Sequence, residues 1–443
     1  MPQHIVIIGN GIAGITCARN IRKQGNDNIT VISSETEHFY SRTALMYIFM
    51  GHMKYEHTKP YEDWFWEKNR IRLLKEHVTS IDIKDKKLSL QNCAAISYDK
   101  LVIATGSVSN KPNFPGMELK GVQSLYGIPD LELMNENSKG IKKAVIIGGG
   151  LIGIEMAEML LSRNIHITFL VRENLYWDNV LPKEEASLIS KHIREHHVDL
   201  RNATEVKEIR GADNGKVSSL ITTKGEEIIC EFVGVTVGVS PNISLLKTTD
   251  IETDRGVLVN EYFETNIPDV YAIGDCVQHR NPPAGRKTVE QVWYTGRIHG
   301  ETVAPTLCGK RTAYNPAPWF NSAKFFDIEY QTYGTINSQE QGHETSFYWE
   351  HDKGRICFRA VYNKENETII GFNVLGMRLR HEVCDKWLQE KRKIDDVMTN
   401  LQQLNFDPEF FDKHEEDIIS SYNQQTGKNI NRKKKKMLSF FTW

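Results

Sequence analysis

Residues 4–14 read HIVIIGNGIAG, and residues 143–153 read KAVIIGGGLIG. Each stretch is a short apolar run that ends in the pattern Gly-x-Gly-x-x-Gly, and each is followed by a helical pattern and a second apolar run. A buried parallel strand, a tight glycine turn and a helix produce this order of residues. The duplication therefore predicts two Rossmann-like α/β domains within one chain.

The glycines of the first stretch have separate tasks in a strand-turn-helix unit. Gly9 permits the tight turn, Gly11 lets the backbone approach a pyrophosphate without an intervening Cβ, and Gly14 allows close packing of helix and strand. The N-terminus of the helix presents free N–H groups and a partial positive charge to phosphates. Glu35 lies about 26 positions after Gly9, where a carboxylate accepts hydrogen bonds from an adenosine ribose. We therefore expect a dinucleotide at this turn.

The second stretch leaves the choice of nicotinamide nucleotide open. The position after its second apolar run holds Val171, followed by Arg172 and Glu173. A carboxylate here favours the free ribose hydroxyl of NADH, whereas an arginine can bind the additional phosphate of NADPH. Both residue types are present, so either nucleotide fits, with a slight preference for NADH because Glu173 is near.

Length and composition are those of a multidomain globular protein. The chain has 443 residues, of which 40% are hydrophobic, and its 55 basic and 57 acidic side chains nearly cancel. No net field therefore attracts nucleic acid. The sequence begins without the pattern of a signal peptide and contains no apolar run of about 18 residues, so we expect a cytoplasmic protein.

Cysteines and histidines indicate neither a disulfide framework nor a metal site. The seven cysteines are widely scattered, and none forms a C-x-x-C pair. His192, His196 and His197 have partial helical spacing for a metal, but they lie in a charged stretch that is typical of a solvated helix face. We therefore expect no bound metal.

Further apolar runs complete the two domains. The runs at 101–106 and 232–238 end in small residues, and each is expected to be a late strand of its own nucleotide domain. A third run at 267–275 closes on Gly274-Asp275 and lies outside the second unit. It is expected to return to the first sheet.

The C-terminal part has a different pattern. Alternating apolar residues from Trp319 predict an antiparallel sheet, and helices are expected at 381–404 and 408–422. Residues 432–443 are a basic run followed by an apolar and aromatic run. Such a segment is either a flexible end or dimer arm, or it binds the anionic inner face of a membrane through charge attraction and interfacial aromatic side chains.

Both glycine patterns, the strand end Ala104-Thr105-Gly106 and the strand end Gly274-Asp275 occur in an order that resembles the pyridine nucleotide-disulfide oxidoreductase superfamily, over roughly residues 1–320. The resemblance implies an α/β fold of two Rossmann-like dinucleotide-binding domains, one inserted in the other, plus an α+β C-terminal domain. It implies an FAD-binding domain at 1–115 and 248–318, an NAD(P)-binding domain at 116–247 and an interface domain at 319–443. In relatives the last of these commonly forms a homodimer.

The segment 35–45 carries acidic residues followed by a Tyr-x-Arg pattern, and it is similar to that of the NADH reductases for rubredoxin, ferredoxin and nitrite reductase systems. By this resemblance Arg42 lies near the flavin or its pyrophosphate, and Asp275 accepts a hydrogen bond from the ribityl chain. Disulfide members of the superfamily carry Cys-x4-Cys just after the acidic residue, whereas residues 36–56 contain no cysteine. Reduction of a dithiol substrate is thereby excluded.

The resemblance also implies the residues that meet the cofactors. Glu155 and Glu290 are expected near the nicotinamide as the catalytic residues, where they orient the ring because the hydride passes directly to flavin N5. The expected FAD-binding residues are Gly9, Gly11, Ile12, Ala13, Gly14, Ser34, Glu35, Arg42, Val78, Ala104, Thr105, Gly106, Gly274, Asp275 and Trp293. The expected nicotinamide nucleotide-binding residues are Gly148, Gly150, Leu151, Ile152, Gly153, Arg172, Glu173 and Gly238.

Together these features predict an FAD-dependent NAD(P)H oxidoreductase. NAD(P)H is expected to reduce the flavin, which then passes electrons directly to an acceptor such as a rubredoxin- or ferredoxin-like carrier. An NADH oxidase or quinone reductase is one alternative. A nucleotide-dependent redox-sensing or interaction protein with little turnover is the other.

Overall fold

The structure is a computed structural model that describes residues 2–407, 409–410 and 412–432. Its contacts divide the chain into two compact units. Among the described residues, unit 1 comprises residues 2–172 and 198–316, and unit 2 comprises residues 173–197 and those from 317 to 432. The division into three domains remains a prediction.

The first sheet of unit 1 is built around the N-terminal strand. Its five strands run parallel in the order β19-β7-β1-β2-β3. They are β1 (His4–Ile8), β2 (Asn28–Ser33), β3 (Ile71–Lys75), β7 (Lys100–Ile103) and β19 (Val270–Ala272). Because β19 pairs with β7, the prediction that residues 267–275 return to the first sheet is confirmed.

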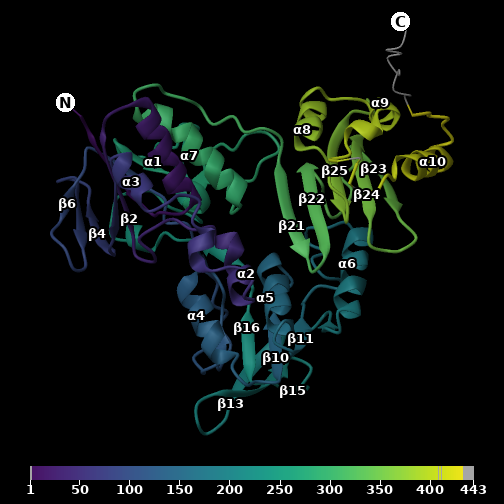
Figure 1. Cartoon of the computed structure of the whole chain (residues 1–443), viewed down its shortest axis with the longest axis horizontal. Helices are drawn as coiled ribbons and strands as arrows, with labels where there is room; N and C mark the ends of the chain where they lie inside the picture. The colour runs from purple at the N-terminus through teal and green to yellow at the C-terminus, as the bar shows by residue number, and fades with distance from the viewer. Residues whose placement is uncertain (1, 408, 411, 433–443) are drawn as a thin grey trace, which may run out of the picture. The chain divides into compact units, whose positions relative to one another are not determined.

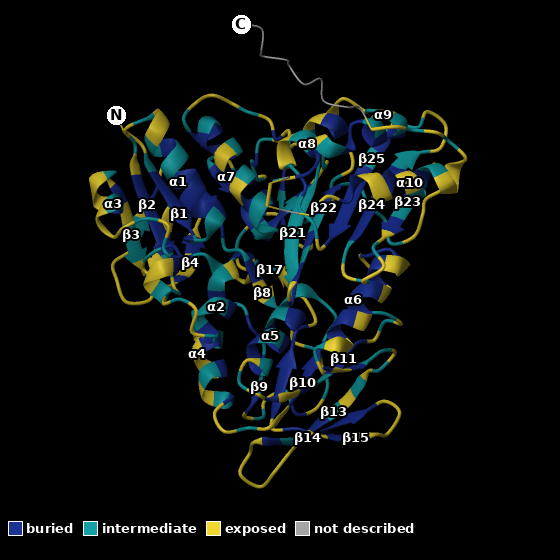
Figure 2. Cartoon of the chain, turned by 45° about the vertical axis from the view of Figure 1, so that its right-hand side comes forward, coloured by how far each residue is buried: buried dark blue, intermediate teal, exposed yellow. Residues whose placement is uncertain are grey.

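The second sheet of unit 1 repeats this arrangement around the second glycine pattern. Its strands also run parallel, in the order β12-β11-β10-β16-β9. They are β9 (Val122–Gln123), β10 (Lys143–Ile147), β11 (His166–Leu170), β12 (Asp199–Arg201) and β16 (Phe232–Val235). Figure 2 shows β1 and β10 buried, as their apolar runs require. The predicted fold class with two Rossmann-like sheets is thus confirmed.

Two helices distant in sequence pack together beside the first sheet. Helix α1 (Ile12–Gln24) lies against α7 (Trp293–Leu307), as Figure 1 shows. A Cβ on Gly300 of α7 would lie 2.5 Å from the carbonyl oxygen of Ala13, so this close approach requires glycine. The remaining helices of unit 1 are η1 (Arg42–Ala44), α2 (Leu45–Phe49), η2 (Tyr55–Thr58), α3 (Trp64–Lys68), α4 (Ile128–Asn137), α5 (Leu151–Leu161), η3 (Ser244–Leu246) and η4 (Gly274–Cys276).

Short strands complete unit 1. The three-stranded sheets consist of β4 (Val78–Asp82), β5 (Lys87–Leu90) and β6 (Ile96–Ser97), and of β13 (Val206–Gly211), β14 (Val217–Thr222) and β15 (Glu227–Ile229). The two-stranded pairs are β8 (Ser107–Ser109) with β17 (Val239–Pro241), and β18 (Val257–Val259) with β20 (Val277–His279). The β8–β17 pair joins the strand ends of the two parallel sheets.

Unit 2 contains the predicted antiparallel sheet, with strand order β21-β22-β25-β24-β23. The strands are β21 (Phe320–Phe325), β22 (Ile328–Gly334), β23 (Glu344–Glu350), β24 (Cys357–Asn363) and β25 (Ile369–Leu375). Helix α6 (Lys183–Glu195) is tied to this sheet by a buried ion pair, in which Arg359 of β24 donates to both carboxylate oxygens of Glu185 at 2.7 and 2.8 Å. Since a buried charge without a partner is costly, this pair holds α6 in place.

The prediction of one continuous helix over residues 381–404 is wrong. The structure has α8 (His381–Gln389), α9 (Ile394–Thr399) and η5 (Leu401–Gln403). Between α8 and α9, Arg392 accepts a hydrogen bond from the N–H of Ile369, and Lys393 forms an isolated bridge with Thr368. The backbone is thus used for pairing with β25, which interrupts the helix.

Two further expectations about helices also need correction. The last helix, α10 (Glu415–Thr426), begins at Glu415 and not at residue 408. The charged stretch 191–201 was expected to be solvated, but His192 is only 1% exposed. It packs against the turn after β21 instead, through contacts described below.

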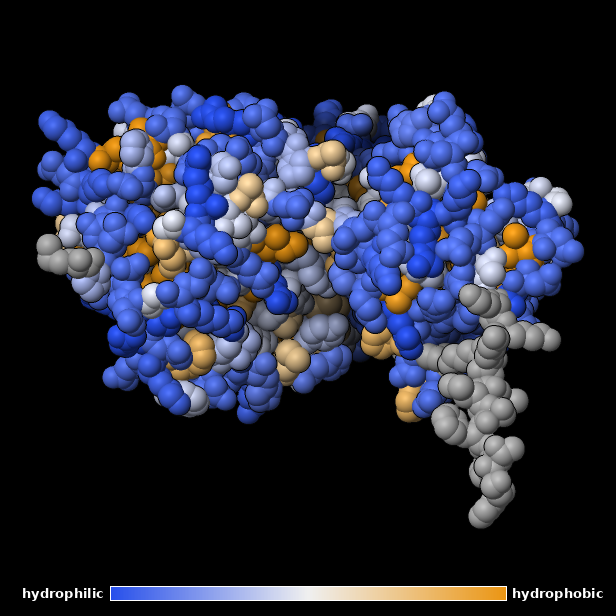
Figure 3. All heavy atoms as spheres, turned by 90° about the horizontal axis from the view of Figure 1, so that it is seen from above, coloured by the Kyte–Doolittle hydropathy of each residue, from blue (hydrophilic) through white to orange (hydrophobic). Residues whose placement is uncertain are grey.

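No helix among the described residues is long and apolar enough to cross a bilayer. The face drawn in Figure 3 is largely hydrophilic, with apolar residues in scattered small groups. The segment 432–443, whose sequence suggests membrane binding as one alternative, lies outside the described residues apart from Arg432. Its role remains a prediction.

Candidate cofactor-binding site

The carboxyl ends of the first sheet bring the first group of predicted residues together. In register, Ile8 lies opposite Ile32 and Ile103, and Ile103 lies opposite Ala272. The residues that follow these strands, among them Gly9, Ala104 and Gly274, therefore meet at one edge of the sheet. In parallel sheets, ligands bind in the crevice outside this edge.

Two of the three glycines in the first pattern are required by the fold itself. Gly9 has φ +119°, and a Cβ there would lie 2.1 Å from the carbonyl oxygen of Ala104. A Cβ on Gly14 would lie 2.0 Å from the carbonyl oxygen of Gly9. Any side chain at either position would collide with backbone.

Gly11 is different, because nothing in the protein requires glycine there. Its backbone angles, φ −67° and ψ −179°, are open to every residue type, and a Cβ would meet no atom within 4 Å. Gly11 is the N-cap of α1, where neither a side-chain cap nor an acidic residue occupies the first turn. The open space at the N-terminus of a helix fits a bound pyrophosphate.

The second pattern repeats this contrast. Gly148 has φ +111°, and its Cβ would lie 2.5 Å from the carbonyl oxygen of Thr236. A Cβ on Gly153 would lie 2.6 Å from the carbonyl oxygen of Gly148. Gly150, with φ −104° and ψ −179°, would again meet nothing within 4 Å. Each glycine pattern thus contains one glycine whose missing Cβ leaves room for a ligand, so the residues present fit two dinucleotides.

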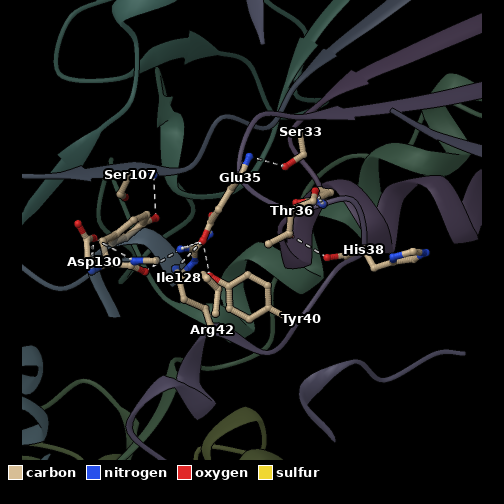
Figure 4. A network of polar contacts seen from close by, with 12 residues as sticks. Ser33, Glu35, Thr36, His38, Tyr40, Arg42, Ser107, Ile128 and Asp130 are labelled. Carbon is tan, nitrogen blue, oxygen red and sulfur yellow. Dashed lines mark hydrogen bonds and ion pairs between the residues drawn. The ribbon is translucent and has the colours of Figure 1, made fainter. Parts of the chain in front are cut away.

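Glu35 is the centre of a polar network at the end of β2 (Figure 4). Its carboxylate accepts hydrogen bonds from the hydroxyl of Tyr40, from Nη2 of Arg42 at 2.6 Å and from the backbone N–H of Ile128 at 2.9 Å. Arg42 also donates to the carbonyl oxygen of Tyr126 at 2.6 Å. The network fastens the end of β2 to the start of α4.

Burial alone would raise the pKa of Glu35, but the guanidinium of Arg42 and the three donated hydrogen bonds outweigh it and hold that pKa below its ordinary value. Glu35 is therefore an anion at neutral pH, as an acceptor for ribose hydroxyls must be. Arg42 lies against this carboxylate. The contact of Glu35 with ribose and that of Arg42 with the flavin stay predictions.

Asp275 closes the site from the last strand of the first sheet. Its carboxylate accepts a hydrogen bond from Ser107 Oγ at 3.1 Å, and Ser107 Oγ accepts one from Gln291 Nε2 at 2.6 Å. The N–H of the preceding Gly274 donates to Nδ1 of the buried His299 at 3.1 Å. Burial raises the pKa of Asp275 to about 6. Such a partly satisfied carboxylate fits the predicted contact with a ribityl hydroxyl.

The thiols near this edge are unsuited to electron relay. All seven cysteines are free, and residues 36–56 contain none. Cys276 follows Asp275 directly, but burial raises its pKa to about 11, so it is a neutral thiol at pH 7. Because the thiolate is the reactive form, Cys276 is a packing residue.

Glu155 lies in the first turns of α5, behind Gly150. Burial, followed by the charge of Glu158, raises the pKa of Glu155 to about 7. Perturbed carboxylates of this kind are common at functional sites. Its approach to the nicotinamide remains a prediction.

Glu155→Gln is expected to stabilise the protein at pH 8 but not at pH 4. The pKa in the folded protein lies above the ordinary value, so the folded state binds more protons between about pH 4.5 and 7, and stability falls as the pH rises through this window. Glutamine does not titrate, so the variant lacks this pH-dependent loss of stability. At pH 8 its free energy of unfolding should exceed that of the wild type by up to roughly 3 kcal/mol. Urea unfolding at both pH values measures it. The exposed Glu132→Gln is the control, and an equal gain at pH 4 and 8 would contradict the assignment.

Glu290 is fully engaged within the protein. Arg286 donates to both of its carboxylate oxygens at 2.8 and 2.6 Å, while the N–H of Lys287 and the hydroxyl of Thr295 donate at 3.2 Å. The residue as a whole is 8% exposed. Its hydrogen bonds hold the segment that leads into α7. Its place at the nicotinamide ring stays a prediction.

The other predicted residues lie at the ends of strands and helices in unit 1, with one exception. Val78 is buried in the core, Ser34 is exposed after β2, and Nε1 of Trp293 has no hydrogen-bond partner within the described part of the chain. The exception is Glu173, which the contacts place in unit 2. The remaining predicted residues at these ends are Ile12, Ala13, Ala104, Thr105, Gly106, Leu151, Ile152, Arg172 and Gly238.

Sequence reasoning missed several residues that the structure brings to the site: Tyr40, Ser107, Tyr126, Gln291 and His299. Tyr40 and Ser107 lie beside predicted motifs, in the Tyr-x-Arg pattern and directly after Gly106. A search of the residues flanking each motif could have found them. Tyr126 and His299 carry no local signal.

Comparison with known proteins agrees with this geometry. The family profile described as "Pyridine nucleotide-disulphide oxidoreductase" matches residues 3–298. Rhodocoxin reductase of Rhodococcus erythropolis is 30% identical over 331 residues, which cover 72% of this chain and 76% of the relative. The nitrite reductase [NAD(P)H] of Bacillus subtilis is 29% identical over 379 residues, which cover 84% of this chain. The chain spans only about half of that larger relative, 46% of its length.

A solved structure supports the fold over almost the whole chain. The NAD-dependent persulfide reductase from A. fulgidus superposes with a TM-score of 0.84 at 25% identity. The match covers 96% of this chain and 84% of that protein. The likeness extends beyond the residues that the family profile matches.

Proposed function

The chain belongs to the pyridine nucleotide-disulphide oxidoreductase family, and we propose that it oxidises NAD(P)H through bound FAD and passes the electrons directly to a small redox protein. The expectation of an FAD- and NAD(P)H-dependent oxidoreductase is confirmed at the level of the family. The electron acceptor and the route to it are the proposal.

One observation carries the proposal: neither the backbone angles nor the surrounding protein atoms require glycine at Gly11 or Gly150. Each stands at the start of a helix, at the carboxyl edge of its own parallel sheet. A dinucleotide at both edges explains why a Cβ is absent from both positions. The unreactive thiols then favour direct electron transfer over a dithiol relay.

Different residues of the chain would hold different parts of the two nucleotides. The first turn of α1 and the anionic Glu35 would hold the pyrophosphate and ribose of FAD, and Asp275 would hold its ribityl chain. The first turn of α5 would hold the nicotinamide nucleotide, with Glu155 orienting its ring. Bound FAD supplies the step from a two-electron hydride donor to single electrons. No side chain needs to act as an acid or base in the hydride transfer itself.

Rapid mixing under anaerobic conditions tests this function. We expect NADH or NADPH to bleach the flavin absorbance. A rubredoxin or a [2Fe–2S] ferredoxin should then restore the absorbance at least about tenfold faster than oxygen or a soluble quinone does. A tenfold difference in rate corresponds to about 1.4 kcal/mol in the activation barrier. Faster reoxidation by oxygen or quinone would identify an oxidase or quinone reductase. Failure of both nucleotides to reduce the flavin would favour a nucleotide-sensing protein.

Several finer predictions accompany the proposal. Arg172 and Glu173 leave the choice between NADH and NADPH open, and comparing the two nucleotides in the same experiment decides it. Cytoplasmic location, membrane contact through 432–443 and a homodimer also remain proposals. The proposal of a redox-protein acceptor is supported by the name of a relative, rhodocoxin reductase.

A further inference from the structure

A cluster of three metal-ligating side chains lies in unit 2, outside the residues of the proposed redox site. His192 and His196 come from the end of α6, and Asp327 comes from the turn between β21 and β22. One ligand atom of each lies within 4.8 Å of the others. Asp327 Oδ1 is 2.6 Å from Nε2 of His192 and 3.5 Å from Nε2 of His196.

Local structure explains why these side chains converge. The histidines are four residues apart, so they project from the same face of the helix end. Phe325 pairs with Ile328 across the hairpin, which leaves Phe326 and Asp327 as its two-residue loop. The ring of Phe326 stacks on that of His196 with centroids 4.2 Å apart and an interplanar angle of 7°, which fixes the imidazole.

Hydrogen bonds leave the lone pair of His196 pointing to the cluster. Nδ1 of His196 lies 3.0 Å from the carbonyl oxygen of His192. A carbonyl oxygen can only accept, so Nδ1 carries the proton and Nε2 is free to bind a cation. Asp327 is oriented in a similar way, because Arg355 donates to its Oδ2 at 3.3 Å while Oδ1 faces the two rings.

One ring nitrogen of His192 lacks a hydrogen-bond partner in the described part of the chain, and a cation bound to the other nitrogen would account for this. Within the described residues, its buried Nδ1 has no hydrogen-bond partner, although Glu195 Oε2 lies 3.7 Å away. A cation on Nε2 would place the proton on Nδ1, where it could be donated to Glu195, the usual outer partner of a metal-bound imidazole.

We propose that His192, His196 and Asp327 bind a divalent transition-metal cation with the chemistry of zinc. Two imidazoles and one carboxylate are a zinc-type ligand set, whereas calcium and magnesium prefer oxygen ligands only. Three protein ligands leave the fourth tetrahedral position to water, and Asp327 opens the cluster to solvent with a side chain that is 58% exposed. The cation clamps the end of α6 to the β21–β22 hairpin.

Zinc titration of the full-length, flavin-loaded protein tests this site, with a chromophoric zinc indicator as competitor. We expect one equivalent of Zn²⁺ to bind with a dissociation constant in the micromolar range or below. Asp327→Asn and His196→Gln should each weaken binding at least about 30-fold. His197→Gln and Cys93→Ser, which alter an exposed neighbouring histidine and an exposed thiol, should leave it unchanged.

Thermal unfolding gives a second readout with the same proteins. Zn²⁺ should raise the melting temperature of the wild type and of His197→Gln by several degrees, because a ligand that binds only the folded state stabilises it. Mg²⁺ should have no effect, and Asp327→Asn should show no shift with zinc. Circular dichroism confirms that each variant is folded. Binding of zinc to Asp327→Asn and His196→Gln as tight as to the wild type, or none to the wild type below about 100 μM, would overturn the proposal.

Discussion

Gly11→Ala is expected to abolish stable flavin binding while the fold is retained. The angles at Gly11 accept alanine, and the added Cβ touches no protein atom within 4 Å, so folding has no cause to suffer. The Cβ would instead occupy the space assigned to the pyrophosphate of FAD. We expect the dissociation constant of FAD to rise about 100-fold, which corresponds to about 2.8 kcal/mol. Flavin absorbance after gel filtration and fluorescence titration of the apoprotein with FAD measure it.

Two other glycines, one within α1 and one at its C-terminal end, serve as matched comparisons. Gly25 follows α1 with extended backbone, and its Cβ would come no closer than 4.0 Å to another atom, so Gly25→Ala should keep its flavin. Gly14→Ala should fail to fold, because its Cβ would lie 2.0 Å from a carbonyl oxygen. Normal flavin content in folded Gly11→Ala would remove the FAD site from this turn.

Gly150→Ala is expected to keep its flavin but to lose reduction by nicotinamide nucleotides. The reasoning is the same as for Gly11, since the backbone accepts alanine and the Cβ meets nothing within 4 Å. Here the Cβ would obstruct the pyrophosphate of NAD(P)H. We expect the nucleotide concentration for half-maximal flavin reduction to rise about 100-fold, or about 2.8 kcal/mol. Stopped-flow measurement of the flavin absorbance gives this concentration.

A chemical reductant separates this effect from damage to the flavin site. Dithionite should reduce the flavin of Gly150→Ala as fast as that of the wild type, because it needs no nucleotide site. Gly342→Ala lies in unit 2 and also meets nothing within 4 Å, so it should behave as the wild type. If Gly150→Ala were reduced normally by NADH and NADPH, the second edge would not be the nicotinamide site.

The parts of the site that the sequence predicted are those with a local backbone signature. Gly9 and Gly148 need positive φ, and Asp275 follows a buried strand closely, so each could be recognised within a few residues of its own position. Ser107 and His299 could not, since they reach Asp275 and Gly274 from 168 and 25 positions away. Their roles depend on which strands become neighbours in the sheet.

The C-terminal helices show the same limit in another form. Apolar periodicity over 381–404 is continuous, and it predicts one helix. The structure interrupts it where Arg392 and Lys393 pair with Ile369 and Thr368. A hydrogen-bonding strand edge competes for the same backbone groups that the helix would use, and periodicity does not register that competition.

The sequence by itself determined the two parallel-sheet units, their glycine turns, the antiparallel sheet and the absence of a cysteine pair after Glu35. These depend on repeat distances and backbone angles, which are properties of neighbouring residues. Only the tertiary structure decided what each side chain meets. It joined Glu35 to Ile128 across 93 positions, committed Glu290 to Arg286, and brought Asp327 to His192 across 135 positions. Such partnerships arise from strand order and helix docking, because packing brings together side chains that no local pattern relates.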